Sequence, residues 1–389
     1  MTIHSKLPNV GTTIFTVMSA LAEQHGALNL AQGFPNFDTP DGLKNLVNQY
    51  MTRGANQYAP MAGVARLREV LSEKIEKLYG KPTDPNTEIT ITAGGTQALF
   101  TAIAAFIRPD DEVILIEPAY DSYAPSIETF GGRVVSYQLV GPDFRVDWTV
   151  FARLITLKTK MIIINTPHNP TGKVLTINDL ENLKQIVSNT DIIVLSDEVY
   201  EHLTFDGRLH ASVLRLPELA ARSIAAFSFG KTFHATGWKM GYVVAPEGLM
   251  TEFRKVHQFN VFSVNTPIQH ALADFLSDEN NYLNLPNFYQ AKRDFFLSEM
   301  HGSRFVALES EGTYFQLFDY QRISDMDDVT FCRWLTTEVG VAAIPVSVFY
   351  RLKKGENTDG AVSAQKLIRL CFAKTEETLA AAAARLRSL

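Results

Sequence analysis

One segment, residues 223–246, constrains this chain most, because it delivers an isolated lysine directly at the end of a buried strand. It reads S-I-A-A-F-S-F-G-K-T-F-H-A-T-G-W-K-M-G-Y-V-V-A-P, with apolar runs at 224–229 and 240–245. Short apolar runs of this kind are typical of strands in the core of a sheet. Lys231 follows the first run, where partial removal from water lowers the pKa of an amine. An amine of lowered pKa is what Schiff-base chemistry with a carbonyl compound requires.

The residues around Lys231 strengthen this interpretation. Ser228 precedes Lys231 by three residues and Lys239 follows it by eight. A hydroxyl group and a second cation at these positions are suited to hold one anionic group. A lysine at a strand end is ordinarily a surface residue, but the whole spaced set S-x-x-K-x7-K, with T-G-W inside it, favours a functional site.

The phrase K-T-F-H-A-T-G-W-K resembles the cofactor-lysine signature of fold-type-I pyridoxal-phosphate enzymes, specifically class I aminotransferases. Within that family the wording is most similar to the group that holds kynurenine, glutamine and methionine aminotransferases. The first lysine of the family motif carries pyridoxal 5′-phosphate as a Schiff base, and the second contacts the cofactor phosphate. The resemblance therefore implies covalent pyridoxal 5′-phosphate on Lys231, with Lys239 and Ser228 as phosphate ligands.

Strands and helices alternate through the middle of the chain. The stretches 111–120, 132–139, 160–165 and 192–195 predict strands separated by helical patterns, as in a mostly parallel α/β sheet. From about residue 285 a helix and then alternating strands follow, which is an α+β pattern. Together with the resemblance, this predicts a fold-type-I transferase: a mostly parallel seven-stranded central sheet in a large domain, and a smaller α+β domain from both chain ends. We assign residues 1–40 to an N-terminal arm and part of the small domain, 41–284 to the large cofactor-binding domain, and 285–389 to the C-terminal small domain.

A second phosphate-binding motif is expected at residues 88–107. The stretch E-I-T-I-T-A-G-G-T-Q-A-L predicts a short strand, a Gly-Gly turn and a helix. Backbone N–H groups and the positive end of the helix dipole at such a turn favour a phosphate. Tight strand–helix turns need glycine in any case, so the Gly-Gly turn alone is weak evidence for a phosphate site. Its value is that it adds a second group of candidate phosphate ligands to Ser228 and Lys239. We assign Gly95, Thr96 and Gln97 to the phosphate site.

Three further loops supply groups for the cofactor ring. The stretch S-D-E-V-Y ends a predicted strand with Asp197 and Tyr200. Acidic residues there are commonly helix caps, but a carboxylate that faces a pyridine nitrogen keeps it protonated and makes the ring an electron sink. The resemblance implies that role for Asp197, a hydrogen bond from Tyr200 to the ring hydroxyl, a hydrogen bond from Asn169 of N-P-T-G to the ring oxygen, and stacking of Tyr120 on the ring. Lys231, Asp197 and Tyr200 are the expected catalytic residues.

The substrate contacts are also implied by the resemblance. Arg369 stands in I-R-L-C-F-A-K, where the family places the bidentate clamp on the substrate α-carboxylate, although a strand arginine is usually an exposed edge residue. Asn169 is expected to help fix the carboxylate. The Gly33 backbone in A-Q-G-F-P-N is expected beside the carboxylate, and Phe34 and Phe349 are expected to border the side-chain pocket.

The phrase around Tyr58 indicates a second subunit. It stands in N-Q-Y-A-P-M-A-G, and a tyrosine in the matching family phrase reaches the cofactor phosphate of the other subunit. An exposed tyrosine next to a proline is otherwise most often a packing residue. The resemblance implies a homodimer in which Tyr58 completes the neighbouring site.

Composition excludes several classes of partner. The chain of 389 residues has 36 basic and 42 acidic side chains and a formal net charge of −6. A mildly acidic chain without a basic run is not typical of proteins that bind nucleic acid or anionic membranes. Two cysteines without paired spacing indicate neither a disulfide framework nor a metal site, and no apolar run reaches the length of a membrane span or the core of a signal peptide. We therefore expect a cytoplasmic protein with no nucleic-acid, membrane or metal partner.

The expected activity is transfer of the amino group of an L-amino acid to a 2-oxo acid, in two half-reactions on one cofactor. The phrases S-V-N-T-P, G-T-Y-F-x-L-F-D-Y and A-A-I-P-V-S-V-F resemble methionine aminotransferases, so methionine is the expected donor, followed by aromatic amino acids or glutamine. A cysteine-conjugate β-lyase or a kynurenine–oxoglutarate aminotransferase on the same scaffold is the alternative. A non-catalytic cofactor-binding regulatory module is a remote alternative.

Overall fold

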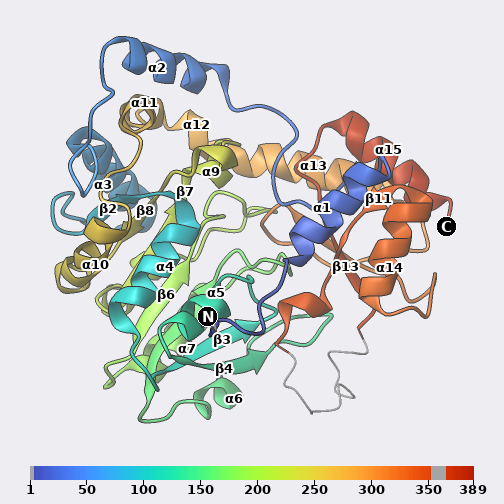
Figure 1. Ribbon diagram of the computed structural model, residues 1–389, viewed down its shortest axis with the longest axis horizontal. Helices are drawn as coiled ribbons and strands as arrows, with labels where there is room; N and C mark the ends of the chain where they lie inside the picture. Colours follow the sequence, from blue (N-terminus) through green and yellow to red (C-terminus); the bar gives the residue numbers. More distant parts are fainter. Residues whose placement is uncertain (1–3, 352–364) are drawn as a thin grey trace.

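One seven-stranded sheet forms the centre of the protein, in a computed structural model that describes residues 4–351 and 365–389 (Figure 1). The strand order is β2-β8-β7-β6-β5-β3-β4. The strands are β2 (Ile89–Thr92), β3 (Glu112–Glu117), β4 (Arg133–Gln138), β5 (Thr159–Asn165), β6 (Ile193–Asp197), β7 (Ser223–Ser228) and β8 (Gly241–Val244). β8 runs antiparallel to β2 and β7, and the other pairs are parallel. The predicted mostly parallel, seven-stranded sheet is therefore confirmed.

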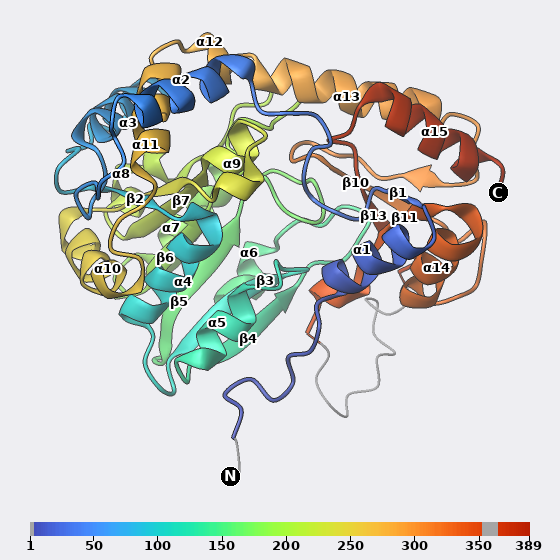
Figure 2. The same ribbon diagram turned by 45° about the horizontal axis from the view of Figure 1, so that its top comes forward.

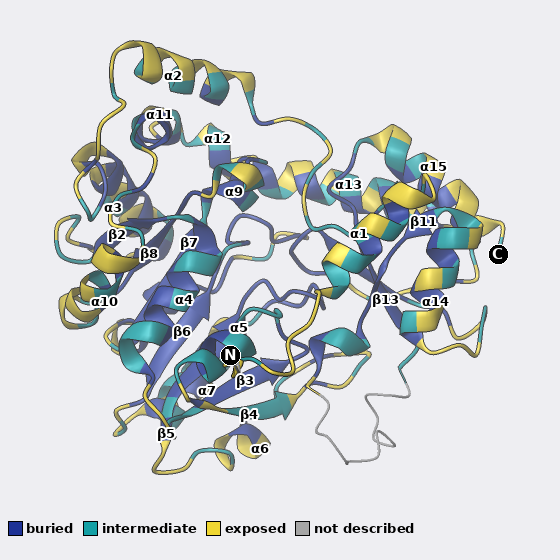
Figure 3. Ribbon diagram, in the orientation of Figure 1, coloured by how far each residue is buried: buried dark blue, intermediate teal, exposed yellow. Residues whose placement is uncertain are grey.

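Both faces of the middle of this sheet are covered, which explains why β3, β5 and β6 are mostly apolar rather than alternating. In β3, Val113 and Leu115 join one buried cluster while Ile114 and Ile116 join the other. Helices α4 (Gly94–Phe106), α5 (Tyr123–Thr129) and α10 (Glu247–Asn260) contribute to the first cluster, and α3 (Ala65–Tyr79), α7 (Ile177–Val187) and α8 (Pro217–Ala220) to the second. Most strands of the sheet are dark blue in Figure 3 because they are buried, whereas the edge strand β4 is largely teal because its residues are half-buried.

A second, smaller unit stands beside the large sheet, drawn in orange and red in Figure 1. Its antiparallel sheet has the order β12 (Ile344–Pro345), β13 (Leu367–Cys371), β10 (Phe315–Asp319) and β9 (Val306–Ala307). The helices α13 (Leu285–Glu299), α14 (Asp328–Trp334) and α15 (Glu376–Arg387) belong to the same part of the chain, and α13 packs against α15. β13 is an interior strand, so its side chains are held between two neighbours.

The N-terminal segment joins this smaller unit. α1 (Ile14–Gln24) leads into β1 (Leu28–Asn29), which pairs in parallel with β11 (Val341–Ala342). The chain then crosses to α2 (Asp41–Thr52), which packs against α11 (Thr266–Leu276) near the large sheet, and α13 returns along the same side in Figure 2. Both chain ends thus build the small unit, as expected, while boundaries at residues 40 and 284 stay a prediction. The remaining short helices are α6 (Trp148–Ala152), α9 (Phe229–Thr232) and α12 (Asn280–Leu283).

A buried ionic cluster lies behind β7 and β8, outside the cavity described below. Lys74 of α3 and Glu201 form an ion pair of 2.6 Å, and the Tyr79 hydroxyl donates to the same carboxylate. The Tyr242 hydroxyl on β8 lies 3.0 Å from both the Lys74 amine and the Glu201 carboxylate. Burial opposes the charge on Glu201, but Lys74 and His202 hold the pKa of Glu201 well below its usual value. We call these four residues, Lys74, Tyr79, Glu201 and Tyr242, the Lys74 cluster.

Among the residues that the structure describes, no helix combines the length and the apolar character needed to cross a lipid bilayer.

Candidate active site

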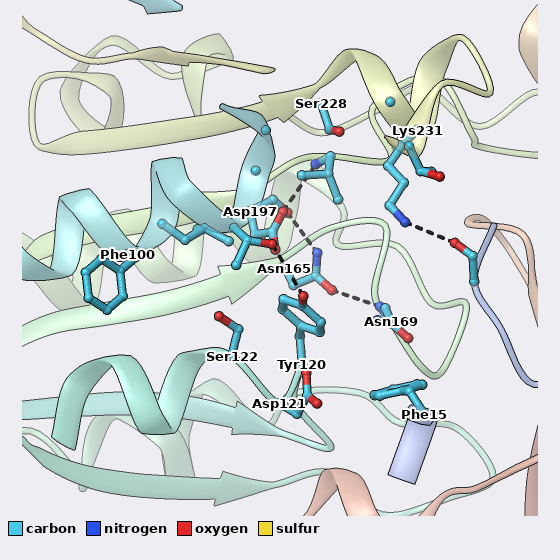
Figure 4. Close-up of a pocket in the computed structure, with 18 of the residues that line it drawn as sticks. Phe15, Phe100, Tyr120, Asp121, Ser122, Asn165, Asn169, Asp197, Ser228 and Lys231 are labelled. Carbon is cyan, nitrogen blue, oxygen red and sulfur yellow. Dashed lines mark hydrogen bonds between the residues drawn. The ribbon is translucent and has the colours of Figure 1, made fainter. Parts of the chain in front are cut away.

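A cavity of about 640 Å³ lies at the carboxyl ends of β5, β6 and β7, where ligand sites of parallel sheets are generally found. The start of α4, the N-terminal segment and β13 complete its wall (Figure 4). The predicted site residues that line it are Gly33, Gly95, Thr96, Tyr120, Asn169, Asp197, Tyr200, Ser228, Lys231, Lys239 and Arg369. Residues spread over most of the chain are therefore brought to one place.

Lys231 stands in α9, the single helical turn that follows β7. Its amine donates to the Gly33 carbonyl oxygen at 3.1 Å and to the Tyr314 hydroxyl at 2.9 Å. Burial lowers the pKa of Lys231 to about 8, and the nearby cations Arg369 and Lys239 act in the same direction. A much larger fraction of this amine is therefore neutral near pH 8 than of an ordinary lysine, as a nucleophile or base requires.

Asp197 ends β6 and faces the cavity from the large sheet. The Tyr123 hydroxyl donates to its Oδ2 at 2.5 Å, and the Val199 N–H lies 3.3 Å from Oδ1. Burial raises the pKa of Asp197 to about 6, although these two hydrogen bonds and Lys231 oppose the shift. A buried carboxylate with so few partners favours a cationic ligand group beside it.

A chain of hydrogen bonds connects Asp197 to Arg369 through two asparagines. The Asn165 amide donates to the Asp197 backbone carbonyl at 2.9 Å and accepts from the Asn169 N–H at 2.8 Å. The Asn169 side-chain oxygen accepts from Arg369 Nη1 at 2.7 Å. The two ends of the cavity are thus held in one rigid arrangement, and Figure 4 shows Asp197, Asn165 and Asn169 in sequence along it.

Arg369 is buried in the interior strand β13, so the interpretation as an exposed edge residue is wrong. Its second bond goes to the Ala31 carbonyl at 3.1 Å, and the rings of Phe15, Phe315 and Phe349 lie 5.2, 3.8 and 5.1 Å from its Cζ. Burial lowers its pKa to about 10, and its Nε has no hydrogen-bond partner among the described residues. Arg369 is held between aromatic rings and forms no ion pair with a carboxylate of the described residues, although the Asp121 carboxylate of the lining favours its charge. The guanidinium is therefore available for an anionic ligand.

The opposite end of the cavity suits a phosphate. Gly94 begins α4 with φ of 81°, a left-handed conformation that favours glycine, and no side chain caps the first N–H groups of the helix. Lys239, itself left-handed with φ of 54°, and Ser228 line the same cavity. The Gln97 side chain is turned away, toward the Ala93 N–H, the Thr101 hydroxyl and His257, so any contact of Gln97 with a ligand would come from its backbone.

The structure places the other predicted residues outside the cavity lining. Phe34 is 46% exposed, and its carbonyl accepts a hydrogen bond from Lys374. Phe349 is buried, with its ring against the Arg369 guanidinium. Tyr58 is 83% exposed and packs edge-on against Phe262. Its role toward a second subunit stays a prediction.

Sequence reasoning missed Asn165, Tyr123 and Tyr314. Asn165 carried a usable signal, because a polar residue that ends a buried strand lies at the edge where the other site residues gather. Tyr123 carried none, and Tyr314 stood in the phrase G-T-Y-F-x-L-F-D-Y, which does not indicate its partner. Their partners Asp197 and Lys231 are far away in sequence, and only the fold brings them together.

Comparison with known protein families identifies the family to which this chain belongs. The model of the family described as aminotransferase class I and II matches residues 26–386 of this chain. The chain belongs to that family. Aminotransferases of class I and II depend on pyridoxal 5′-phosphate, and this protein is a transaminase of that type.

Relatives of this aminotransferase match over nearly its whole length. A methionine aminotransferase of Escherichia coli is 54% identical over 387 residues, which are 99% of this chain and 98% of the relative. A kynurenine–oxoglutarate transaminase of Mus musculus is 33% identical and covers 98% of this chain and 96% of its own length. A crystal structure of an Escherichia coli protein with a methionine aminotransferase function has a TM-score of 0.95 and 52% identity, with 100% of both chains covered.

The aminotransferase's own residues fit this cofactor. The first turn of α4, Ser228 and Lys239 offer N–H groups, a hydroxyl and a cation at the end suited to a phosphate. The amine of Lys231, with its pKa lowered, is suited to a carbonyl carbon, and Asp197 is suited to a ring N–H. A cavity of about 640 Å³ has room for such a cofactor together with a small amino acid.

Proposed function

We propose that this aminotransferase transfers the amino group of L-methionine to a 2-oxo acid, with aromatic amino acids and glutamine as weaker donors. The observation that carries the proposal is the 54% identity to a methionine aminotransferase over nearly the full length of both chains. The charge of the cavity supports it. Lys231 and Lys239 are assigned to the cofactor, which leaves Arg369 for the α-carboxylate and no described cation of the lining for an acidic side chain.

The cofactor is held by the residues that line the cavity. Lys231 is the attachment point, and Ser228, Lys239 and the N–H groups of Gly95 and Thr96 bind the phosphate. When bound, pyridoxal 5′-phosphate supplies an electron sink for the pair of electrons left at the substrate Cα. Asp197 faces the ring nitrogen, Tyr200 and Asn169 donate to the ring oxygen, and Tyr120 stacks on the ring. Gln97 is also assigned to the phosphate site, through its backbone N–H group rather than its side chain.

The reacting carbon is placed by the carboxylate clamp. Arg369 and Asn169 bind the substrate α-carboxylate beside Gly33, and the neighbouring Phe15 and Phe315 rings keep water from the guanidinium. Fixing the carboxylate orients the Cα–H bond toward the Lys231 amine, which takes the proton as general base. The Phe34 and Phe349 assignments to the side-chain pocket remain part of this proposal.

We also propose a cytoplasmic homodimer in which Tyr58 completes the neighbouring phosphate site. Its 83% exposure supports a role outside its own subunit, since a tyrosine normally buries most of its ring. Sedimentation of Tyr58→Ala and of the parent protein tests this. Weaker cofactor retention in a variant that still forms dimers is the expected result, whereas a monomeric parent would contradict the proposal.

The deciding experiment is a single-turnover measurement on cofactor-loaded protein mixed with L-methionine. We expect loss of the cofactor's visible absorption, one equivalent of keto acid per site, and recovery of the absorption when a fresh 2-oxo acid is added. Loss of absorption with kynurenine but not with methionine would replace the substrate and keep the reaction. Pyruvate and ammonia from a cysteine conjugate, without any acceptor acid, would indicate a β-lyase, and no turnover of any amino acid would indicate a regulatory module.

A further inference from the structure

Tyr314, the residue directly before β10, lies against the amine of Lys231, although the phrase G-T-Y-F-x-L-F-D-Y that contains it gave Tyr314 no role of its own. Its hydroxyl accepts a hydrogen bond from the Lys231 amine at 2.9 Å and donates to the Gly33 carbonyl oxygen at 2.6 Å. The same carbonyl accepts from the Lys231 amine at 3.1 Å, the bond that leaves Lys231 in Figure 4. An amine, a hydroxyl and a carbonyl therefore form a closed triangle.

The Tyr314 ring has little freedom to turn. It is fully buried, meets the Tyr200 ring edge-on at 5.3 Å, and contacts the rings of Phe315 and Tyr289 at 4.9 and 5.8 Å. A buried hydroxyl without partners is unfavourable, so the hydroxyl stays between Gly33 and Lys231. Its place relative to the Lys231 amine is thus set by packing.

The direction of the hydrogen bonds has a chemical consequence. Because the Tyr314 proton is engaged with the Gly33 carbonyl, the hydroxyl can only accept from Lys231. A neutral amine that donates N–H bonds to two acceptors keeps its lone pair free and directed away from both of them. Burial holds the pKa of Tyr314 well above its usual value, so this hydroxyl does not protonate the amine in exchange.

We propose that Tyr314 and the Gly33 carbonyl bind the Lys231 amine whenever it is not bonded to the cofactor. Tyr314 is then a positioning residue for this general base. The proposal rests on the proposed function, in which the amine is freed when an amino acid binds. In the step that follows, the Cα–H bond breaks, its proton goes to the Lys231 lone pair, and its electron pair stays with the substrate carbon and the electron sink. Tyr314 acts by orienting the lone pair for that transfer.

The location of Gly33 favours this role. A Cβ atom built at position 33 would lie 2.8 Å from the Phe315 ring, so the backbone there is packed too tightly to move aside. The neighbouring Ala31 carbonyl accepts from Arg369. The backbone of residues 31–33 therefore binds both the Arg369 guanidinium and the Lys231 amine.

The test compares Tyr314→Phe with Tyr289→Phe. The Tyr289 ring touches the Tyr314 ring, but its hydroxyl bonds to His234 at 2.8 Å and not to Lys231, which makes it a matched control. With L-methionine we expect Tyr314→Phe to lower kcat by about 10–100-fold, to leave KM and cofactor affinity within about twofold, and to increase the Cα-deuterium isotope effect. Tyr289→Phe should match the parent in all of these quantities.

A second readout does not need turnover. The apo proteins are treated with pyridoxal 5′-phosphate and borohydride across a pH series, and trapping at Lys231 is followed by peptide mass. Loss of the Tyr314 acceptor disfavours the ammonium form of Lys231, so the trapping curve of Tyr314→Phe should move to lower pH than that of the parent. Tyr289→Phe should keep the parent curve.

Parent rates and a parent trapping curve in Tyr314→Phe would overturn the proposal. It would also fail if Tyr289→Phe lost as much activity, since the effect would then be general packing, or if only KM rose, since Tyr314 would then be a substrate contact. A parent protein that transaminates no amino acid would remove the proposed function, and the trapping curves would still show whether Tyr314 is coupled to Lys231.

Discussion

Two groups of buried charges lie on opposite sides of the segment from Asp197 to Glu201, and they are built differently. In the Lys74 cluster, the lysine and Glu201 are paired at 2.6 Å and two tyrosine hydroxyls complete the set. In the cavity, Lys231 and Arg369 form no ion pair with any carboxylate of the described residues. Removal from water is unfavourable for both groups, but the first is neutralised inside the protein and the second is left for ligands.

The largest expected effect comes from the unpaired group. Lys231→Met keeps the length of the side chain and removes the attachment point and the general base, so turnover should fall by at least about 10⁴-fold. The apo protein should at the same time gain about 1–3 kcal/mol at pH 7, because a cation whose pKa burial has lowered is lost. Steady-state kinetics and urea unfolding of the apo proteins measure the two effects. Turnover above about one per cent of the parent would mean that another lysine carries the chemistry.

The Lys74 cluster should respond in the opposite way. Lys74→Met or Glu201→Gln alone leaves a buried charge without its partner and should destabilise the apo protein by about 3–5 kcal/mol. The double variant removes both charges and should be more stable than either single variant. A double-mutant cycle from urea unfolding gives the coupling free energy. Additive losses would show that the two side chains do not form the pair described.

The pH dependence of Asp197 offers a finer comparison. The pKa of Asp197 in the native protein is about 6, above the value of 3.8 for an ordinary aspartate, so its ionised form disfavours folding of the apo protein. This penalty is absent below pH 3.8 and complete above pH 6. Asp197→Asn should therefore stabilise the apo protein by up to about 3 kcal/mol at pH 8 and leave it unchanged near pH 3.5. A gain that is equal at both pH values would remove ionisation as its cause.

The smallest expected effect concerns Gln97. Its side chain bonds to Ala93, Thr101 and His257 and not to the cavity, so Gln97→Ala should lower stability by about 1 kcal/mol and change cofactor affinity by less than about twofold. Equilibrium dialysis with pyridoxal 5′-phosphate and urea unfolding distinguish the two outcomes. Thr96→Ala, at a residue that lines the cavity, is the matched comparison and should weaken cofactor binding more. A large loss of affinity in Gln97→Ala would place its side chain on the phosphate.

The fold followed from patterns that are local in sequence. Most strands of the large sheet were apolar or alternating stretches between turn residues, and the Gly-Gly turn before α4 was visible from residue types alone. The family resemblance then placed Lys231, Asp197, Asn169 and Arg369, and the cavity contains all of them. Local pattern and motif spacing were sufficient for these residues because each stands at the end of an element or in a distinctive turn.

The supporting contacts could not be predicted in this way. Tyr314 meets Lys231 only because β10 pairs with β13 and the N-terminal segment crosses between the two units. The Arg369 environment likewise depends on Phe15, Phe315 and Phe349, which come from separate parts of the chain. Such contacts are set by tertiary packing: motifs marked the segments that hold Tyr314, Phe315 and Phe349, but they did not indicate which side chains these residues contact.

The late place of β13 in the chain also has a consequence for synthesis. All seven strands of the large sheet, together with Ser228, Lys231 and Lys239, precede residue 245, whereas Arg369 follows much later. Because domains fold in order as the chain leaves the ribosome, the residues of the large sheet proposed to bind the cofactor emerge well before Arg369, the proposed carboxylate clamp. β13 then inserts between β12 and β10, and the Cys371 N–H donates to the Leu30 carbonyl at 2.8 Å. The cavity wall is therefore completed by the last strand of the chain to be synthesised, β13.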